Sequence, residues 1–179
     1  MNTRIIEAGG YYFGNEPLVL KTLLGSCVSI VLWRAASHSG GMCHYLLPDH
    51  EGHGGGDAPG RFADTVMQLF AGYIRDRGER TSDYSAHLIG AGNMFPMHFK
   101  TCADQTQGSQ EVCRHCISVA CRNRAAAWRE ARKYGFKVIG TDLGGTAYRH
   151  LTFDMRNGSI AVQRPQAAGA DTAVVRSAM

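Results

Sequence analysis

The amino-acid sequence predicts a single layered α/β domain. Short apolar runs of strand length alternate with two segments of helical periodicity, which is typical of strands and helices that pack in layers. Glycine, with 22 of 179 residues, is well above its usual share and indicates many tight turns. The chain length suits one domain, and the 44% of hydrophobic residues can form its core.

The first predicted strands lie within residues 17–33. Two apolar runs flank Gly25 and Ser26, which favours two strands or one sharply bent strand. The second run is apolar at odd and even positions alike, as expected for a strand that is covered on both faces. A polar turn over residues 34–40 separates this run from a returning strand over residues 41–48.

Periodicity and turn residues indicate the remaining elements. Apolar residues recur at helical spacing from Phe62 onward, and Gly78 ends that pattern. The pair Asn157-Gly158 between two short runs is the strongest hairpin signal in the chain. In order, we expect a glycine-rich loop over residues 50–60, a helix over 62–74, a strand over 85–92, a helix over 124–135, a strand over 137–145 and a hairpin over 150–163.

Composition sets the domain bounds and argues against some classes of function. We expect the domain over residues 1–164 and a disordered tail over residues 165–179, where small residues offer little to bury. The net charge is +4, but Lys and Arg are scattered, so nucleic-acid binding has little support. The sequence has neither a run of roughly 18 apolar residues nor the apolar core of a signal peptide. We therefore expect a cytoplasmic protein, with no membrane insertion, whose six cysteines are reduced.

Cys27 begins the second apolar run and is the candidate nucleophile. A thiol attacks as its thiolate, so catalysis needs a base nearby, usually a histidine. If residues 27–33 pair antiparallel with residues 38–44, Cys27 and His44 lie opposite each other, with Cβ atoms roughly 4.5–5.5 Å apart. The backbone around Gly25 and Ser26 would then supply N–H donors to an oxyanion.

The alternative interpretation is purely structural. In it, Cys27 is a small core residue and His44 is a hydrogen-bonded strand residue. For an arbitrary cysteine and histidine this is the commoner case, and their spacing alone does not change it.

Several segments of the chain match the sequence patterns of a known family. The segments TLLGSCVSIVLW (22–33) and GGMCHYLLP (40–48) are close to the patterns T-x-LGSCV and GGMxHxLLP. The match continues in HLIGAGNMF, which ends at Phe95, in GTDLGGTAYRHLTF (140–153) and in NGSIAVQ (157–163). Together these segments, spread over residues 17–163, resemble the CheD family of bacterial chemotaxis proteins.

The resemblance implies a fold, an activity and a set of site residues. Members are glutamine deamidases of chemoreceptors, similar to the catalytic domain of cytotoxic necrotizing factor toxins, which implies a layered sandwich of mixed β-sheet with flanking helices. The family's catalytic cysteine and histidine fall on Cys27 and His44, and its threonine falls on Thr22. A one-residue difference in spacing leaves Lys21 as an alternative to Thr22. The implied reaction releases ammonia from a receptor glutamine and uses no cofactor or metal.

The same resemblance implies partners and leaves other functions open. The protein substrate would be the cytoplasmic helices of chemoreceptors, and a CheC-type phosphatase is a further candidate partner. One alternative function is non-catalytic regulation of such a phosphatase. Another is a related thiol hydrolase, for instance a receptor methylesterase.

Two further groups of residues are candidates for binding. Met94 and Phe95 follow a glycine-rich stretch and are candidates for contact with substrate or partner, although core packing is the default interpretation. Four other cysteines lie close together in the sequence: Cys102, Cys113, Cys116 and Cys121. A structural zinc site and free or redox-sensitive thiols both stay open for them. We favour thiols, because the spacing matches known zinc sites only in part and the stretch is polar.

Overall fold

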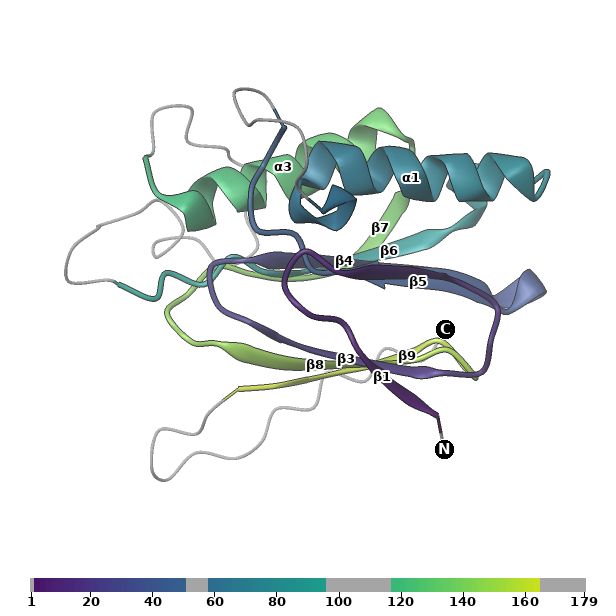
Figure 1. Cartoon of the computed structure of the whole chain (residues 1–179), viewed down its shortest axis with the longest axis horizontal. Helices are drawn as coiled ribbons and strands as arrows, with labels where there is room; N and C mark the ends of the chain where they lie inside the picture. Colours follow the sequence, from purple (N-terminus) through teal and green to yellow (C-terminus); the bar gives the residue numbers. More distant parts are fainter. Residues whose placement is uncertain (1, 51–57, 96–116, 165–179) are drawn as a thin grey trace.

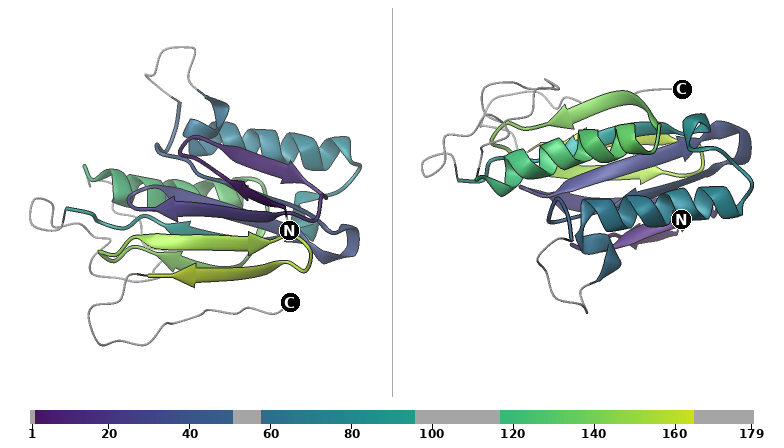
Figure 2. Two further views of the ribbon diagram at one scale, coloured as in Figure 1. Left: turned by 60° about the horizontal axis from the view of Figure 1, so that its bottom comes forward. Right: turned by 90° about the horizontal axis from the view of Figure 1, so that it is seen from above.

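Across residues 2–50, 58–95 and 117–164, which this computed structural model describes, the chain folds into three layers. Figure 1 shows the helices above a five-stranded sheet and a four-stranded sheet beneath it. Helices α1 (Ala63–Asp76) and α3 (Val119–Lys133) lie side by side over the five-stranded sheet (Figure 2). The predicted layered α/β class is therefore confirmed.

The five-stranded sheet is the middle layer. Its strand order is β2 (Tyr11–Gly14), β5 (Ser39–Cys43), β4 (Val28–Arg34), β6 (Ser85–Gly90) and β7 (Lys137–Leu143). Neighbouring strands are antiparallel except β6 and β7, which are parallel, with α3 in the connection between them. Strand β4, at the centre, is buried from Val28 to Trp33, as predicted from its apolar residues at odd and even positions alike.

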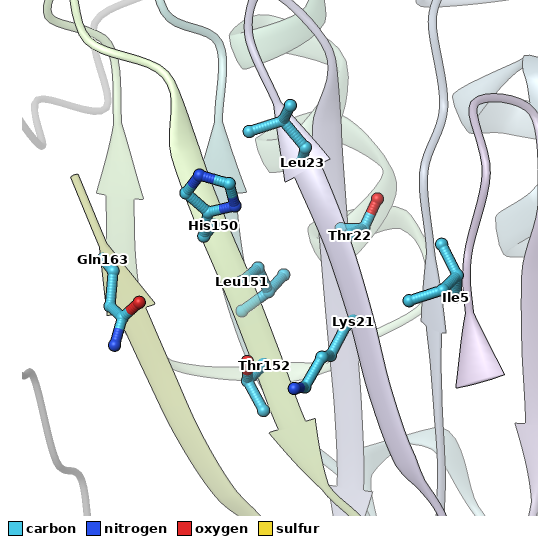
Figure 3. Close-up of a pocket in the computed structure, with 8 residues that line it drawn as sticks. All are labelled: Ile5, Lys21, Thr22, Leu23, His150, Leu151, Thr152 and Gln163. Carbon is cyan, nitrogen blue, oxygen red and sulfur yellow. The ribbon is translucent and has the colours of Figure 1, made fainter. Parts of the chain in front are cut away.

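The four-stranded sheet forms the third layer. Its order is β1 (Thr3–Ile5), β3 (Val19–Leu24), β8 (Arg149–Asp154) and β9 (Ser159–Gln163). On β3 the even-numbered residues are buried against the middle layer, whereas Lys21 and Leu23 are exposed on the outer face. Figure 3 shows residues that line a groove on this sheet, Lys21 and His150 among them.

A core of large apolar side chains holds the two sheets together. Its members include Leu20, Leu24, Val31, Trp33, Met42, Ile89, Leu151 and Phe153. The rings of Trp33 and Phe153 meet edge to face, with centroids 5.8 Å apart. Burying a side chain of this size contributes about 1.5–3 kcal/mol, so the packing of the two sheets is well defined.

The structure confirms most of the predicted elements and corrects three. Periodicity predicts no strand before residue 17, whereas β1 and β2 lie there; each is too short for a periodic signal. The returning strand, expected over 41–48, is β5 and spans Ser39–Cys43. The second helix was expected from residue 124 but begins five residues earlier, at Val119, with Ser118 at its N-cap position.

Some predictions fall outside the described residues. These are the disordered tail over 165–179 and most of the glycine-rich loop over 50–60. Within the described ranges, neither helix has the length and the continuous apolar character that crossing a bilayer demands.

The predicted hairpin around Asn157-Gly158 is confirmed and gives a stability test. Gly158 has φ +76°, and a Cβ at this position would lie 2.2 Å from Trp33 Nε1. Gly158→Ala should therefore destabilise the protein by about 1–3 kcal/mol through overpacking, in addition to the cost of its backbone conformation. Gly78→Ala is the matched control, since Gly78 has φ +72° with nothing within 4 Å of its Cβ position.

Urea unfolding of both variants measures the difference. We expect Gly158→Ala to unfold at a clearly lower urea concentration than Gly78→Ala. Equal midpoints would contradict the packing of the hairpin turn against Trp33.

Candidate active site

The candidate site lies between the two sheets, where β3 leads through a short turn into β4. Thr22 lies on the inner face of β3, Cys27 directly precedes β4, and His44 directly follows β5. Thr22 and His44 are buried, with exposed fractions of 7% and 6%, while Cys27 is partly exposed beside the inter-sheet core. The Thr22 hydroxyl contacts the His44 ring, and Cys27 packs against the same inter-sheet core.

The pairing of β4 with β5 differs from the predicted register by two positions. Arg34 pairs with Ser39, and the bridge between Val28 and Tyr45 continues the same register. In this register Cys27 stands opposite residue 46, not opposite His44 as predicted. The difference arises because the turn occupies residues 35–38, with His38 in the left-handed conformation, and not residues 34–37.

The corrected register still leaves Cys27 and His44 on one face of the sheet. A shift of two positions preserves the parity, whereas a shift of one would send the side chains to opposite faces. The two residues are diagonal neighbours across the strand pair, a relation that long side chains can bridge. Val31 lies on the same face as Cys27, and Met42 lies on the same face as His44. Both pack in the core between the sheets.

Thr22 fixes the orientation and the tautomer of His44. Thr22 Oγ1 lies 2.7 Å from His44 Nδ1 and 2.7 Å from the carbonyl oxygen of Ile6. Because a carbonyl only accepts, the Thr22 hydroxyl donates its proton to Ile6 and can only accept from His44. His44 Nδ1 therefore carries the ring proton, and Nε2 is unprotonated and able to act as a base.

The structure also distinguishes between the two candidates for the third position. The Lys21 side chain is on the exposed outer face of β3, and Figure 3 shows it at the groove there. Thr22, the next residue, points to the opposite face and contacts His44. Alternation along the strand thus assigns the inner position to Thr22.

The N-terminal segment supports His44 in a way that the sequence analysis missed. The backbone N–H of His44 donates to the carbonyl of Gly10 at 2.9 Å, and its carbonyl accepts from Gly9 N–H at 2.8 Å. The Ile6 carbonyl completes the support through Thr22. The aromatic run Tyr11–Phe13 was the signal that could have predicted a strand here.

Burial keeps the thiol and the imidazole neutral. Burial raises the pKa of Cys27, and a hydrogen bond with the Ser26 side chain only partly opposes this. Burial also lowers the pKa of His44, against smaller opposing effects of the Ile6 carbonyl and the Glu7 carboxylate. At neutral pH Cys27 is therefore a protonated thiol and His44 a neutral imidazole.

Cys43 shows what a purely structural cysteine looks like in this fold. It is fully buried, its sulfur accepts a hydrogen bond from Ile30 N–H at 3.4 Å, and burial raises its pKa to about 12. Of the cysteines in the described ranges, only Cys27 is partly exposed. Cys27 is thus the thiol in this part of the chain that a substrate can reach.

The turn before Cys27 borders a pocket of about 240 Å³. The carbonyl of Gly25 accepts from Gly92 N–H at 2.8 Å, and the Met94 side chain lies against Gly25. Ser26, Met94 and Phe95 all line the pocket, and Phe95 is 66% exposed. The structure therefore places both candidate contact residues beside the cysteine turn, and Phe95 is not a core residue.

One of the four clustered cysteines lies within the described residues. Cys121 lies on α3 and is buried. Cys102, Cys113 and Cys116 lie outside the described residues.

Comparison with known proteins identifies relatives over most of the chain. The family model described as CheD chemotactic sensory transduction matches residues 46–164. A probable chemoreceptor glutamine deamidase CheD 1 of Chromobacterium violaceum is 32% identical over 163 residues, covering 91% of this chain and 78% of the relative. Probable chemoreceptor glutamine deamidases CheD of Pseudomonas syringae pv. tomato and Pseudomonas savastanoi pv. phaseolicola are 32% and 34% identical, covering 89% of this chain and 87% and 82% of themselves. This chain therefore belongs to the CheD family.

Proposed function

We propose that this protein deamidates glutamine side chains of chemoreceptors, with Cys27 as nucleophile, His44 as acid and base, and Thr22 as the residue that orients His44. The observation that carries this proposal is the Thr22–His44 hydrogen bond, which leaves Nε2 unprotonated on the sheet face that also carries Cys27. The names of the curated relatives supply the substrate class.

The first half of the reaction forms a thioester. His44 Nε2 takes the proton of the Cys27 thiol as the sulfur attacks the carboxamide carbon of the glutamine. The carbonyl oxygen becomes an oxyanion, which backbone N–H groups of the turn around Gly25 and Ser26 stabilise. The C–N bond then breaks, and the nitrogen takes the proton from His44 and leaves as ammonia.

The second half hydrolyses the thioester. His44 Nε2 takes a proton from a water molecule as the water oxygen attacks the thioester carbon. The C–S bond breaks, and the sulfur regains the proton from His44. The reaction consumes one water, releases one ammonia and leaves a glutamic acid, which ionises at neutral pH.

The surroundings of the site suit a protein substrate. The pocket beside the cysteine turn is bordered by Met94 and by the exposed ring of Phe95, which can pack against apolar side chains of a receptor helix. A cytoplasmic location follows from such a substrate, because the implied target is the cytoplasmic part of the receptor. The similarity to cytotoxic necrotizing factor toxins stays a prediction from the family resemblance, as does a CheC-type phosphatase partner.

A first prediction concerns the two catalytic residues. After incubation with a receptor cytoplasmic fragment, mass spectrometry should show glutamine-to-glutamate conversion at specific sites, together with ammonia release. Cys27→Ala and His44→Ala should each lower the rate at least about 10³-fold, because the nucleophile and its base act as a unit.

Two controls separate this activity from the alternatives. Cys43→Ala should retain deamidation, since that thiol is fully buried away from solvent. No conversion with the wild-type protein would contradict the deamidase proposal. Methanol release from a methylated receptor fragment, without ammonia, would instead identify a methylesterase. Binding of a CheC-type phosphatase without either activity would identify a regulatory protein.

A second prediction concerns Thr22. Thr22→Val keeps the shape of the side chain but removes the acceptor for His44 Nδ1, so kcat for deamidation should fall roughly 10- to 100-fold. Thr22→Ser restores the hydroxyl and should remain within several-fold of the wild type. Ammonia release from the receptor fragment measures both variants. Equal activity of Thr22→Val and wild type would show that this hydrogen bond has no part in catalysis.

A further inference from the structure

Asn123 connects helix α3 to both strand ends that carry the candidate site. Its side-chain Nδ2 donates to the carbonyl of Ser26 at 3.1 Å and to the carbonyl of Leu46 at 2.8 Å. Ser26 directly precedes Cys27, and Leu46 follows His44 by two residues. One amide group therefore clamps the cysteine turn to the segment that carries the histidine.

The orientation of this amide is determined by its neighbours. Both partners are carbonyl oxygens, which only accept, so the nitrogen end of the side chain must face them. Asn123 is fully buried, and the hydroxyl of Tyr45 donates to its backbone carbonyl at 2.7 Å. Burial of the whole side chain in the packed helix therefore holds the donor in place, and the Tyr45 bond reaches only the Asn123 backbone.

The bond to Ser26 sets the direction of the next peptide N–H. The Ser26–Cys27 peptide is trans, so its C=O and its N–H point in opposite directions. Helix α3 packs on one face of the five-stranded sheet, the helix side (Figure 1). Thr22 and His44 meet on the opposite, inter-sheet side, which faces the four-stranded sheet. A Ser26 carbonyl held toward Asn123 therefore turns the Cys27 N–H toward the side on which Thr22 and His44 lie.

The N–H of Cys27 is well suited to be a donor. Within the described ranges, the Gly25 carbonyl accepts from Gly92 N–H, and the Cys27 carbonyl accepts from Ala91 N–H. In the same ranges the Cys27 N–H donates no backbone hydrogen bond. The N–H of the nucleophilic residue lies next to the carbon that the sulfur attacks. Such a donor stabilises negative charge that develops on the neighbouring oxygen.

We propose that Asn123 is a positioning residue for the deamidation reaction: it holds the Ser26 carbonyl on the helix side of the sheet and so aims the Cys27 N–H at the oxyanion. This inference rests on the proposed function and assigns to α3 a part in it. Asn123 acts through the Ser26 carbonyl, so its role is to position the turn.

Asn123→Ala tests the role, with Tyr45→Phe as the matched control. Asn123→Ala removes the donor to Ser26, so kcat for ammonia release from the receptor fragment should fall roughly 10- to 100-fold, with KM changed less than about twofold. Tyr45→Phe removes a buried hydrogen bond at the same helix turn but leaves the Ser26 carbonyl paired. Tyr45→Phe should lose about as much folding stability as Asn123→Ala but should retain the kcat of the wild type. Both variants are assayed at a temperature at which circular dichroism shows them fully folded.

A second readout separates positioning from a general loss of structure. Alkylation of Cys27 by iodoacetamide, followed by mass spectrometry of its peptide, needs the thiolate but no oxyanion donor. Its rate should change less than about twofold in Asn123→Ala. A parallel loss of alkylation and deamidation, or an equal fall of kcat in Tyr45→Phe, would show a structural role only.

The wild-type protein in the same assay keeps the two proposals apart. If the wild type releases no ammonia, the proposed function fails, and with it the role of Asn123. If the wild type and Asn123→Ala are equally active, only the inference about Asn123 is wrong.

Discussion

The hydrogen bond between Thr22 and His44 is the interaction on which the candidate site depends. It joins a residue of the four-stranded sheet to the residue that directly follows β5 of the five-stranded sheet, so it exists only when the two sheets pack correctly. It also orients the imidazole, because the Thr22 hydroxyl is already committed to the Ile6 carbonyl. The inter-sheet core around Trp33 and Phe153 is therefore part of the explanation of the site as well as of the fold.

Burial of the site has a chemical consequence. The same low polarity that raises the pKa of Cys27 lowers the pKa of His44, so the resting pair is neutral. In the proposed mechanism, charge then appears on the imidazole and on the oxyanion. A buried site has a low local dielectric constant. Backbone N–H groups that point at the developing charge therefore stabilise it more strongly there than they would in water. The clamp of Asn123 on Ser26 acts at this step.

The sequence predicted most of the fold and supplied the candidate site residues, but it did not predict how they are arranged. Long periodic elements such as α1, and the hairpin at Asn157-Gly158, follow from local signals. The pairing register of β4 and β5 depends on the turn that His38 closes, and spacing does not encode it. Cys27 and His44 still share a face, because the prediction was wrong by an even number of positions.

Other features could not be predicted because they arise from contacts between distant segments. The choice between Lys21 and Thr22 required the structure of β3, which shows the face that each side chain occupies. The contribution of Ile6 depends on the N-terminal segment lying beside His44. The two carbonyls that Asn123 contacts are 97 and 77 residues away from it in the sequence. Only the family resemblance, through the motifs around Cys27 and His44, indicated the site from sequence alone.

Thr22 holds His44 as a neutral imidazole with its proton on Nδ1. Nitrogen-15 NMR of the histidine side chains, assigned with His44→Ala, reports this protonation state. Around neutral pH we expect a protonated Nδ1 and an unprotonated Nε2 for His44, with a pKa below the ordinary value of 6.5. A proton on Nε2 with Nδ1 bare, or an imidazolium protonated on both nitrogens at neutral pH, would contradict it.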